Sequence, residues 1–379
     1  MVACLTPPGT GAIAVLAVRG PQALEIVQAH FQASKVHGGT SLARQFMLGR
    51  FGDEAKDEVV LVVKQTEPVP LVELHCHGGQ EVVKLLIETL ARHGVREIGW
   101  AEFLLHSESS PLRGLALAQL AQARTARTAG ILLDQYHGAL ERELGGALAA
   151  LDRGDRDSAL KAISMLAQRS PIGRRLTAPW RVVVAGAPNV GKSSLINALV
   201  GYQRSVVSAI PGTTRDLVSA ETAFDGCPVE LIDTAGLREQ AGTLEEQGIG
   251  LARNAVAGAD LCLWVLDAAA APVWPPAKTT NLQYVVNKDD LDSAWDSAEA
   301  LFRVSALSGK GIPELCRAIG GWLVPEPPPP GSGVPFTPDL CDHLEDAQRF
   351  LHDDQLAETR RLVETALGPF GRWPRTATR

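Results

Sequence analysis

The segment from Gly186 to Ser193 constrains the fold more than any other part of this sequence. It reads Gly-Ala-Pro-Asn-Val-Gly-Lys-Ser and directly follows the apolar run Val182–Ala185. A strand, a loop of this spacing and a following helix place backbone N–H groups around one point, and glycine lets the backbone approach a phosphate closely. The segment therefore predicts a phosphate-binding loop. Lys192 would supply charge to the β- and γ-phosphates, and Ser193 a hydroxyl to Mg²⁺.

Apolar runs recur downstream of this loop, at Val229–Ile232, Leu261–Leu266 and Tyr284–Val286. Strands that alternate with helical segments indicate an α/β domain with a parallel sheet and helices on both faces. A chance match to the loop pattern is the alternative. The strand before the loop and the helix after it argue against that alternative.

Polar segments follow these runs in an order that indicates a guanine nucleotide. Asp233-Thr234-Ala235-Gly236 ends one run, where the acid can hold the Mg²⁺ shell and Gly236 can follow the γ-phosphate. Thr214, in Gly212-Thr213-Thr214, can complete the Mg²⁺ coordination when GTP is bound. Asn287-Lys288-Asp289-Asp290 ends another run, and Ser305-Ala306-Leu307 lies where a base-supporting loop belongs. Asp290 can accept hydrogen bonds from guanine N1–H and the 2-amino group, which adenine lacks, so a buried carboxylate there selects guanine.

The chain before this domain divides into two kinds of sequence. Residues 1–108 mix predicted strands (Ile13–Val18, Asp57–Lys64, Leu71–His75) with predicted helices (Pro21–Phe31, Gln80–His93), which indicates an α+β domain. Residues 109–177 are rich in Ala, Leu, Arg and Glu, and predict two long amphipathic helices that break near Arg153-Gly154-Asp155.

The chain after this domain begins with a proline-rich stretch. We expect the nucleotide domain to span residues 178–324, and 325–337 to be a stiff, extended linker. Residues 338–379 predict one further helix, about Pro338–Leu367, and a flexible tail. Three arginines lie between Arg169 and Arg175, as a solvated linker or as a contact for RNA phosphates.

The composition fits a soluble, cytoplasmic protein. The net charge of −7 argues against adhesion of the whole surface to nucleic acid. Six scattered cysteines without a Cys-x-x-Cys pair argue against a zinc or disulfide framework, and no apolar run is long enough to cross a membrane. His75 and His77 would share one face of a strand while Cys76 faces away, so these three cannot converge on one metal ion.

With these motifs in view, the chain resembles the MnmE (TrmE) family of tRNA-modifying GTPases. Thr6–Ala14 resembles the family's opening segment, Val72–Gly79 its Glu-x-His-x-His-Gly-Gly strand and turn, and Leu117–Gln119 the start of its helical domain. The resemblance covers most of residues 1–125 and 178–323.

The resemblance implies a homodimer formed through the folate-domain-like N-terminal domain, and a G domain inserted in a helical domain. It also implies K⁺-dependent pairing of G domains on GTP binding, and tRNA wobble-uridine modification with an FAD-dependent partner protein. The K⁺-binding positions of the family fall on Asn189, Ser208, Ile210 and Thr213. Its catalytic, water-orienting glutamate falls on Glu245. The alternative for Glu245 is a solvated surface glutamate.

Motifs and resemblance together give the predicted GTP-binding residues. They are Asn189, Val190, Gly191, Lys192, Ser193, Ser194, Ser208, Thr213, Thr214, Asp233, Thr234, Ala235, Gly236, Asn287, Lys288, Asp290, Ser305 and Ala306. Ser193 and Thr214 are the predicted Mg²⁺ ligands. GTP and GDP are the expected ligands and Mg²⁺ and K⁺ the expected cofactors.

The sequence departs from the family where folate would bind. The family's folate-binding arginine aligns with Ala17 and its lysine with Gly114, beside Arg113 as a possible substitute. Glu73 alone remains of a folate site, the helical region is shorter than usual, and the family's C-terminal Cys-x-Gly-Lys is not found. We therefore expect no folate. Two functions stay open: a GTPase of tRNA modification, or a diverged regulatory or scaffold GTPase without that chemistry.

Overall fold

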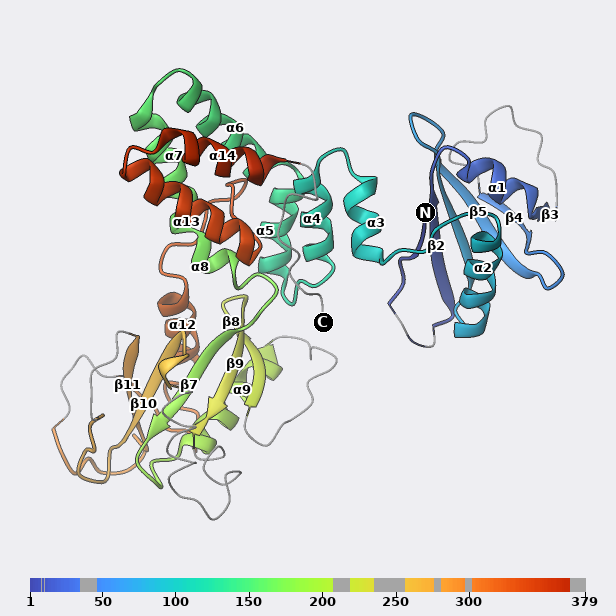
Figure 1. Cartoon of the computed structure of the whole chain (residues 1–379). Coiled ribbons are helices and arrows are strands. Elements are labelled where there is room, and N and C mark those ends of the chain that lie inside the picture. The colour runs from blue at the N-terminus through green and yellow to red at the C-terminus, as the bar shows by residue number, and fades with distance from the viewer. Residues whose placement is uncertain are drawn as a thin grey trace, which may run out of the picture. The chain divides into compact units, whose positions relative to one another are not determined.

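The computed structural model describes residues 1–7, 9, 11–34, 46–206, 219–234, 256–275, 281–296 and 302–368. These residues form two compact units, Met1–Ala118 and Gln119–Arg379 (Figure 1). Within this described part, none of the helices combines the length and the apolar composition that crossing a membrane requires.

The first unit is built on an antiparallel, six-stranded sheet in the order β1-β2-β6-β5-β4-β3. The strands are β1 (Val2–Cys4), β2 (Ile13–Arg19), β3 (Phe31–Ala33), β4 (Phe46–Phe51), β5 (Asp57–Gln65) and β6 (Leu71–His77). The helices are α1 (Ala23–Ala29), α2 (Gln80–Arg92), α3 (Trp100–Ser107) and most of α4 (Pro111–Leu120). The three strands predicted in this region are confirmed. The predicted helix from Pro21 to Phe31 is shorter, because Phe31 already belongs to β3.

Both faces of this sheet are covered by helices. Leu16 and Val18 of β2 are buried with Leu86 and Leu90 of α2. Ala17, between them in the strand, is buried against Phe103 of α3 instead. Successive side chains of a strand point to opposite faces, so α2 and α3 lie on opposite sides of the sheet.

The G-domain part of the second unit has a six-stranded sheet in the order β12-β11-β10-β7-β9-β8. Its strands are β7 (Trp180–Gly186), β8 (Ser219–Phe224), β9 (Cys227–Asp233), β10 (Leu261–Asp267), β11 (Leu282–Asn287) and β12 (Phe302–Arg303). All neighbours are parallel except β8 and β9, which are antiparallel. The sequence predicted neither β8 nor β12, the two edge strands of this sheet.

Helices α9 (Lys192–Val206) and α12 (Ile312–Leu323) share one core with this sheet, in which Leu195, Leu199 and Leu315 are fully buried. On a second cluster, Val256 and Ala259 pack against Val183 and Ile232. The neighbouring residues 235–255 lie outside the described part of the chain.

The helical segments are shorter and more numerous than the sequence predicted. Residues 109–177 form α4, α5 (Ala126–Tyr136), α6 (Ala139–Asp152), α7 (Arg156–Gln168) and α8 (Ser170–Gly173), where two long helices were expected. Gly138, with φ of 85°, separates α5 from α6. The single C-terminal helix is also two, α13 (Pro338–His352) and α14 (Leu356–Leu367), separated at Asp354 with φ of 61°. The apolar spacing continues across Gly138 and across Asp354, so the periodicity alone does not reveal that a helix ends at either position.

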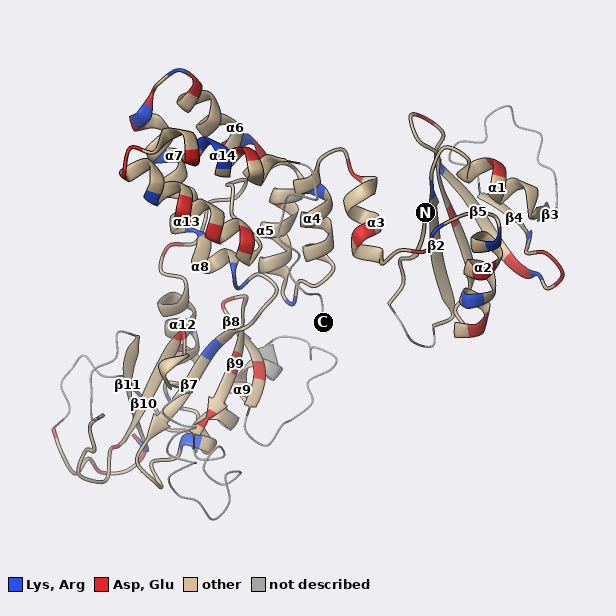
Figure 2. Ribbon diagram, in the orientation of Figure 1, with Lys and Arg blue, Asp and Glu red and all other residues tan. Residues whose placement is uncertain are grey.

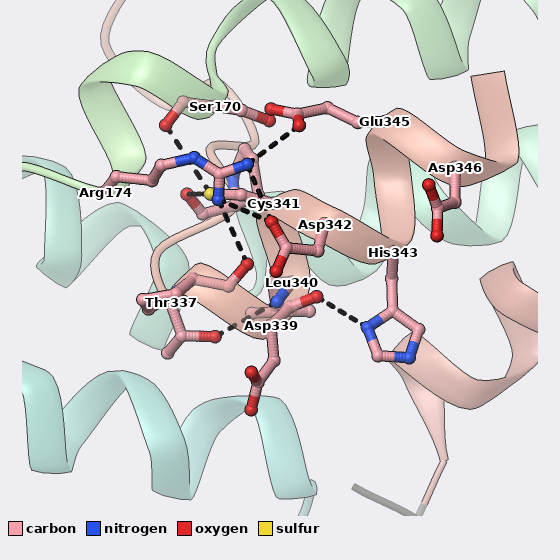
Figure 3. Close-up of polar contacts among 12 residues, drawn as sticks. Ser170, Arg174, Thr337, Asp339, Leu340, Cys341, Asp342, His343, Glu345 and Asp346 are labelled. Atoms are coloured by element: carbon pink, nitrogen blue, oxygen red, sulfur yellow. Dashed lines mark hydrogen bonds and ion pairs between the residues drawn. The ribbon is translucent and has the colours of Figure 1, made fainter. Parts of the chain in front are cut away.

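Helices from both ends of the second unit pack together. α13 contacts α7 and α8, and α14 contacts α6, although the G-domain strands lie between them in sequence (Figure 1). Arg174 donates to Asp342 at 2.9 Å and to Glu345 at 2.8 Å, both on the acidic helix α13 (Figures 2 and 3). Arg169 pairs with Glu143 and Arg175 with Asp260. The interpretation of these arginines as a solvated linker is therefore wrong.

The proline-rich stretch is attached to the helices along its second half. The backbone N–H of Gly331 donates to Asp134, that of Gly333 to Glu143, and that of Val334 to Gln135. Val334 is 1 % exposed. The segment contains a turn, in which the backbone N–H of Ser332 donates to the Pro329 carbonyl at 3.1 Å, and it is not a free spacer.

Candidate nucleotide-binding site

The loop from Gly186 to Gly191 is held in a conformation that requires glycine at both ends. Gly186 and Gly191 have φ of 144° and 90°, and Asn189 has φ of 63°. A Cβ on Gly186 would lie 2.4 Å from the carbonyl oxygen of Val265, and one on Gly191 would lie 2.4 Å from Asn287 Nδ2. From the sequence, these glycines are expected to let the backbone approach a phosphate closely. The structure adds that the neighbouring strand ends also leave no room for a side chain.

Lys192 begins α9 and turns back over the loop. Its Nζ donates to the carbonyl oxygens of Gly186 at 3.2 Å and Ala187 at 2.9 Å, and the residue is 7 % exposed. A nearly buried ammonium group inside a loop of converging N–H groups produces a strong local preference for an anion.

Ser193 and Asp233 bring two oxygen ligands together beside the loop. The Ser193 hydroxyl donates to Asp233 Oδ2 at 2.5 Å. Asp233 ends β9, which pairs with β7 so that Asp233 is opposite Val184. The next residue, Thr234, is anchored by a hydrogen bond from its hydroxyl to the Val184 carbonyl at 3.0 Å. A hydroxyl and a carboxylate are suited to Mg²⁺, so this oxygen pair fits a magnesium–nucleotide complex.

Asn287 joins the phosphate loop to the segment expected to support the base. It is 2 % exposed, and its Nδ2 donates to the Val190 carbonyl at 3.0 Å. Its Oδ1 accepts from the backbone N–H of Ala306 at 3.0 Å. One buried amide therefore holds three separate segments in fixed relation, which the sequence alone did not reveal.

The segment after Asn287 is held by ion pairs on both sides. Lys288 Nζ lies 2.6 Å from Asp267 Oδ2, and Asp267 is opposite Asn287 in the sheet. Asp289 accepts from Lys310 and from Arg303, each at 2.6 Å. The hydrogen bond from Lys310, followed by that from Arg303, lowers the pKa of Asp289 below its usual value. Asp290, the predicted guanine-reading carboxylate, is exposed at the edge of the site rather than buried.

Ser305 and Ala306 form the rim of the same region. Ser305 is fully buried, and its hydroxyl accepts from the backbone N–H of Ser308 at 3.1 Å. Its backbone N–H donates to the Lys310 carbonyl at 2.9 Å. The loop that carries Lys310, and with it the ion pair to Asp289, is thereby closed on itself.

The structure brings one group of predicted residues to neighbouring strand ends. They are Asn189, Val190, Gly191, Lys192, Ser193, Ser194, Asp233, Thr234, Asn287, Lys288, Asp290, Ser305 and Ala306. The remaining predictions, Ser208, Ile210, Thr213, Thr214, Ala235, Gly236 and Glu245, lie outside the described residues. Sequence reasoning missed the supporting side chains Asp267, Asp289, Arg303 and Lys310. Of these, Asp289 lies in the Asn287–Asp290 motif, and Asp267 is an acid at the end of a buried strand, whereas Arg303 and Lys310 had no sequence signal.

The positions aligned with the family's folate-binding charges lie in the first unit and are closed by packing. Ala17 is 1 % exposed and directly opposite Glu73 on the adjacent strand. Glu73 is engaged by His75 Nε2 at 3.2 Å and by Lys64 Nζ at 3.4 Å. A Cβ on Gly114 would lie 2.7 Å from the Cα of Leu105, because α4 crosses close to α3. A longer side chain at this position requires the two helices to separate.

Comparisons with known proteins match two separate parts of the chain to two families of GTP-binding proteins. Residues 1–106 match the model of the N-terminus of the GTP-binding protein TrmE, and residues 181–292 match that of the 50S ribosome-binding GTPases. The chain is 34 % identical over 357 residues to the tRNA modification GTPase MnmE of Thermus thermophilus, covering 84 % of this chain and 81 % of that protein. The MnmE of Moorella thermoacetica is 32 % identical over 373 residues, covering 84 % and 80 %.

Among solved structures, the G domain of FeoB from Methanococcus jannaschii is similar over 38 % of this chain and 97 % of that chain. The identity is 23 % and the TM-score is 0.30.

Proposed function

This chain belongs to the MnmE family of tRNA modification GTPases, and from that premise we propose that its GTP cycle serves tRNA modification. It is a GTPase that binds GTP and GDP, and its family implies the use of Mg²⁺. The tRNA role rests on the similarity to the MnmE proteins. The observation that supports the nucleotide-binding part is the buried amide of Asn287, which joins the phosphate loop to Ala306 and so would fix the distance between phosphate and base sites. This arrangement supports recognition of a whole nucleotide rather than of phosphate alone.

The site residues would divide the work between the two ends of GTP. Lys192 and the N–H groups of residues 189–193 would bind the phosphates, while Ser193 and Asp233 would hold Mg²⁺. Mg²⁺ would neutralise charge that develops on the phosphates. Asp290 would accept hydrogen bonds from guanine N1–H and the 2-amino group. Because its carboxylate is exposed, the bound base would have to shield it from water. Ser305 and Ala306 would support the base.

The residues that would complete this site belong to two further segments. Ser208, Thr213 and Thr214 would contribute to GTP binding, with Thr214 as a further Mg²⁺ ligand beside Ser193 and Asp233. Ala235 and Gly236 would follow the γ-phosphate, and Glu245 would orient the attacking water. Replacement of Glu245 by Ala should then lower turnover while leaving the affinity for GTP unchanged.

We further propose that G domains pair in trans and bind K⁺ through Asn189, Ser208, Ile210 and Thr213. Asn189 supports this proposal, because it is exposed and has φ of 63°, at the tip of the phosphate loop. A cation there would stabilise charge on the transferred phosphoryl group. GTP hydrolysis should be faster in KCl than in NaCl at equal ionic strength, and Asn189→Ala should remove the difference. Equal turnover in the two salts would exclude this part of the proposal.

The domain organisation follows from the same premise. We propose an N-terminal dimerisation domain over residues 1–108 and a helical domain over 109–177 that residues 338–379 complete. The G domain, 178–324, would be inserted in it, with 325–337 as the returning link. The packing of α13 on α7 and of α14 on α6 supports this insertion.

The decisive test of the tRNA role is the wobble-uridine profile of tRNA from a deletion strain. Loss of the modified nucleoside, restored by the wild-type gene but not by a Lys192→Ala gene, would support the proposal. The strain should also be analysed without any second, full-length homologue, because such a homologue would mask the loss. An unchanged profile in that double deletion would exclude the tRNA role. If the nucleoside is lost, a partner protein with an FAD site should also be recovered with the GTP-bound chain.

A second function is favoured by one observation in the first unit. Gly114 leaves no space for the cationic side chain that the family places there, and Ala17 is buried against Phe103. A chain that cycles GTP without one-carbon chemistry would act as a regulatory or scaffold GTPase. An unchanged nucleoside profile combined with normal GTP hydrolysis would favour this alternative.

A further inference from the structure

Three turns of the first unit converge on one carboxylate at one end of the sheet. His30 is the C-cap residue of α1, His93 is the C-cap residue of α2, and Asp53 lies in the turn between β4 and β5. His30 Nδ1 lies 2.9 Å from Asp53 Oδ1, and His93 Nε2 lies 3.7 Å from the same oxygen. The three potential ligand atoms all lie within 4.8 Å of one another.

The convergence is fixed by the backbone. The N–H of Gly52 donates to the carbonyl of His30 at 3.2 Å, which ties the turn before Asp53 to the end of α1. A Cβ on Gly52, whose φ is 138°, would lie 2.2 Å from the carbonyl oxygen of Ala55, so the turn requires glycine. The two imidazole rings are 3.9 Å apart between centroids. Each histidine is thus held near the carboxylate by its place at a helix end.

The spacing matches that of a small metal site. Ligands bound tetrahedrally at about 2.0 Å from a zinc ion are roughly 3.3 Å from one another. The two nitrogen–oxygen distances here, 2.9 and 3.7 Å, lie on either side of that separation. Two imidazoles and one carboxylate also form a donor set that zinc accepts, with water in the remaining position. Asp53 and His93 have side chains 27 % and 39 % exposed, so an ion and its water have access.

The electrostatic surroundings act in both directions. α2 ends at Arg92, and the partial negative charge of a helix C-terminus favours a cation beside His93. Arg92 itself opposes binding, because its Nη2 lies 3.2 Å from Asp53 Oδ2. That contact occupies the carboxylate oxygen that does not face the histidines and leaves Oδ1 to them.

We propose that His30, Asp53 and His93 form a binding site for a divalent transition-metal ion of the Zn²⁺ class. The ion would link the ends of α1 and α2 to the turn between β4 and β5. Metal ions that bind only the folded state stabilise it, so the site would raise the stability of the first unit. The proposal is independent of the nucleotide site, which lies in the other unit.

The test is titration of the full-length chain with Zn²⁺ in the presence of Mg²⁺, GDP and a phosphine reductant. The wild type should bind zinc and gain thermal stability with it. His93→Gln should weaken zinc binding at least about ten-fold. Loss of a residue that only hydrogen-bonds to a metal ligand already costs about ten-fold or more in affinity, and loss of a ligand itself should cost no less. His77→Gln is the matched control, because His77 also pairs with a carboxylate, Asp57 Oδ1 at 2.7 Å, but is not one of the three clustered ligands. Its affinity for zinc should equal that of the wild type.

Arg92→Gln separates a metal site from a purely structural cluster. Removing the competing cation should tighten zinc binding several-fold, whereas loss of a structural ion pair would leave zinc affinity unchanged or lower it. This variant also serves if His93→Gln fails to fold. Equal zinc affinity in the wild type, His93→Gln and Arg92→Gln would overturn the proposal, as would loss of the site in His77→Gln.

Discussion

The nucleotide site of the G domain and the sheet of the first unit differ in whether their packing leaves polar groups available to a ligand. At the strand ends, Asn287 and Ser193 are held by neighbours that fix their functional atoms in place. In the first unit, the family resemblance predicts folate-binding charge at two positions, where this chain has the buried Ala17 and the closely packed Gly114. Both units keep the family's fold. The difference teaches that the packing that maintains a fold does not depend on the few charges expected to bind a ligand.

The largest expected effect is on folate. A folate with a glutamyl tail is anionic, and loss of one charged partner costs about 2–5 kcal/mol, so the changes at Ala17 and Gly114 should reduce affinity by several orders of magnitude. We expect no binding of 5-formyltetrahydrofolate below millimolar concentration in calorimetry. GTP added to the same sample is the positive control. A micromolar site with one folate per chain would erase the contrast between the two units.

The next effect is on the choice of base. Asp290→Asn removes the negative charge and replaces one of the two acceptor oxygens with an NH₂ donor that faces a guanine donor. Charge-assisted hydrogen bonds contribute roughly 1.5–3 kcal/mol each, so GTP should bind about 100-fold more weakly or worse. Xanthosine triphosphate, which offers a matching acceptor, should bind better than to the wild type. Asp292→Asn, an exposed neighbour, is the control and should change neither. Equal affinity of the wild type for ATP and GTP would refute the role of Asp290.

A smaller effect sharpens the contrast through stability. Gly114→Ala places a Cβ 2.7 Å from the Leu105 Cα, and overpacking of this kind costs about 1–3 kcal/mol. Gly145→Ala, in α6 with open space around the new Cβ, should instead stabilise by about 0.5–1 kcal/mol. Urea unfolding measures both, and the affinity for GDP should not change in either. Destabilisation of equal size in the two variants would mean that α3 and α4 do not approach as closely as described.

The smallest effect concerns the ion pairs behind the base site. Asp289→Asn weakens the contacts to Lys310 and Arg303, and one charge-assisted hydrogen bond is worth roughly 1.5 kcal/mol, so GDP should bind about ten-fold more weakly. Xanthosine nucleotides should gain nothing, unlike in Asp290→Asn. Glu314→Gln, in an exposed pair with Arg317, is the control and should have almost no effect.

The same ion pairs make a pH prediction. The folded state lowers the pKa of Asp289, so its carboxylate stabilises the G domain above its unfolded pKa of about 3.9, and this stability is lost as pH falls through the folded pKa. The difference in unfolding free energy between wild type and Asp289→Asn should stay constant from pH 5 to 8 and shrink below about pH 4. A difference that grows on acidification would contradict this assignment.

The sequence was sufficient where short-range patterns decide. The glycine-rich motif predicted the phosphate loop, and the apolar runs predicted strands β7, β9, β10 and β11. A buried strand, a glycine loop and a helix start are each encoded within a few residues. It predicted the break between α6 and α7 at Arg153-Gly154-Asp155 but missed the breaks at Gly138 and Asp354, because the apolar spacing continues across both. It also missed the edge strands β8 and β12, which need no continuous apolar run.

What the sequence by itself determined is therefore the nucleotide class and the type of domain that binds it. Only the tertiary structure decided which distant residues meet: Asn287 with Val190, Asp289 with Lys310, and His30 with Asp53 and His93. The physical reason is that a motif reports local backbone geometry, whereas such contacts depend on strand order and helix packing. Strand order and helix packing are set by the burial of the whole core, and no single segment of the sequence encodes that core.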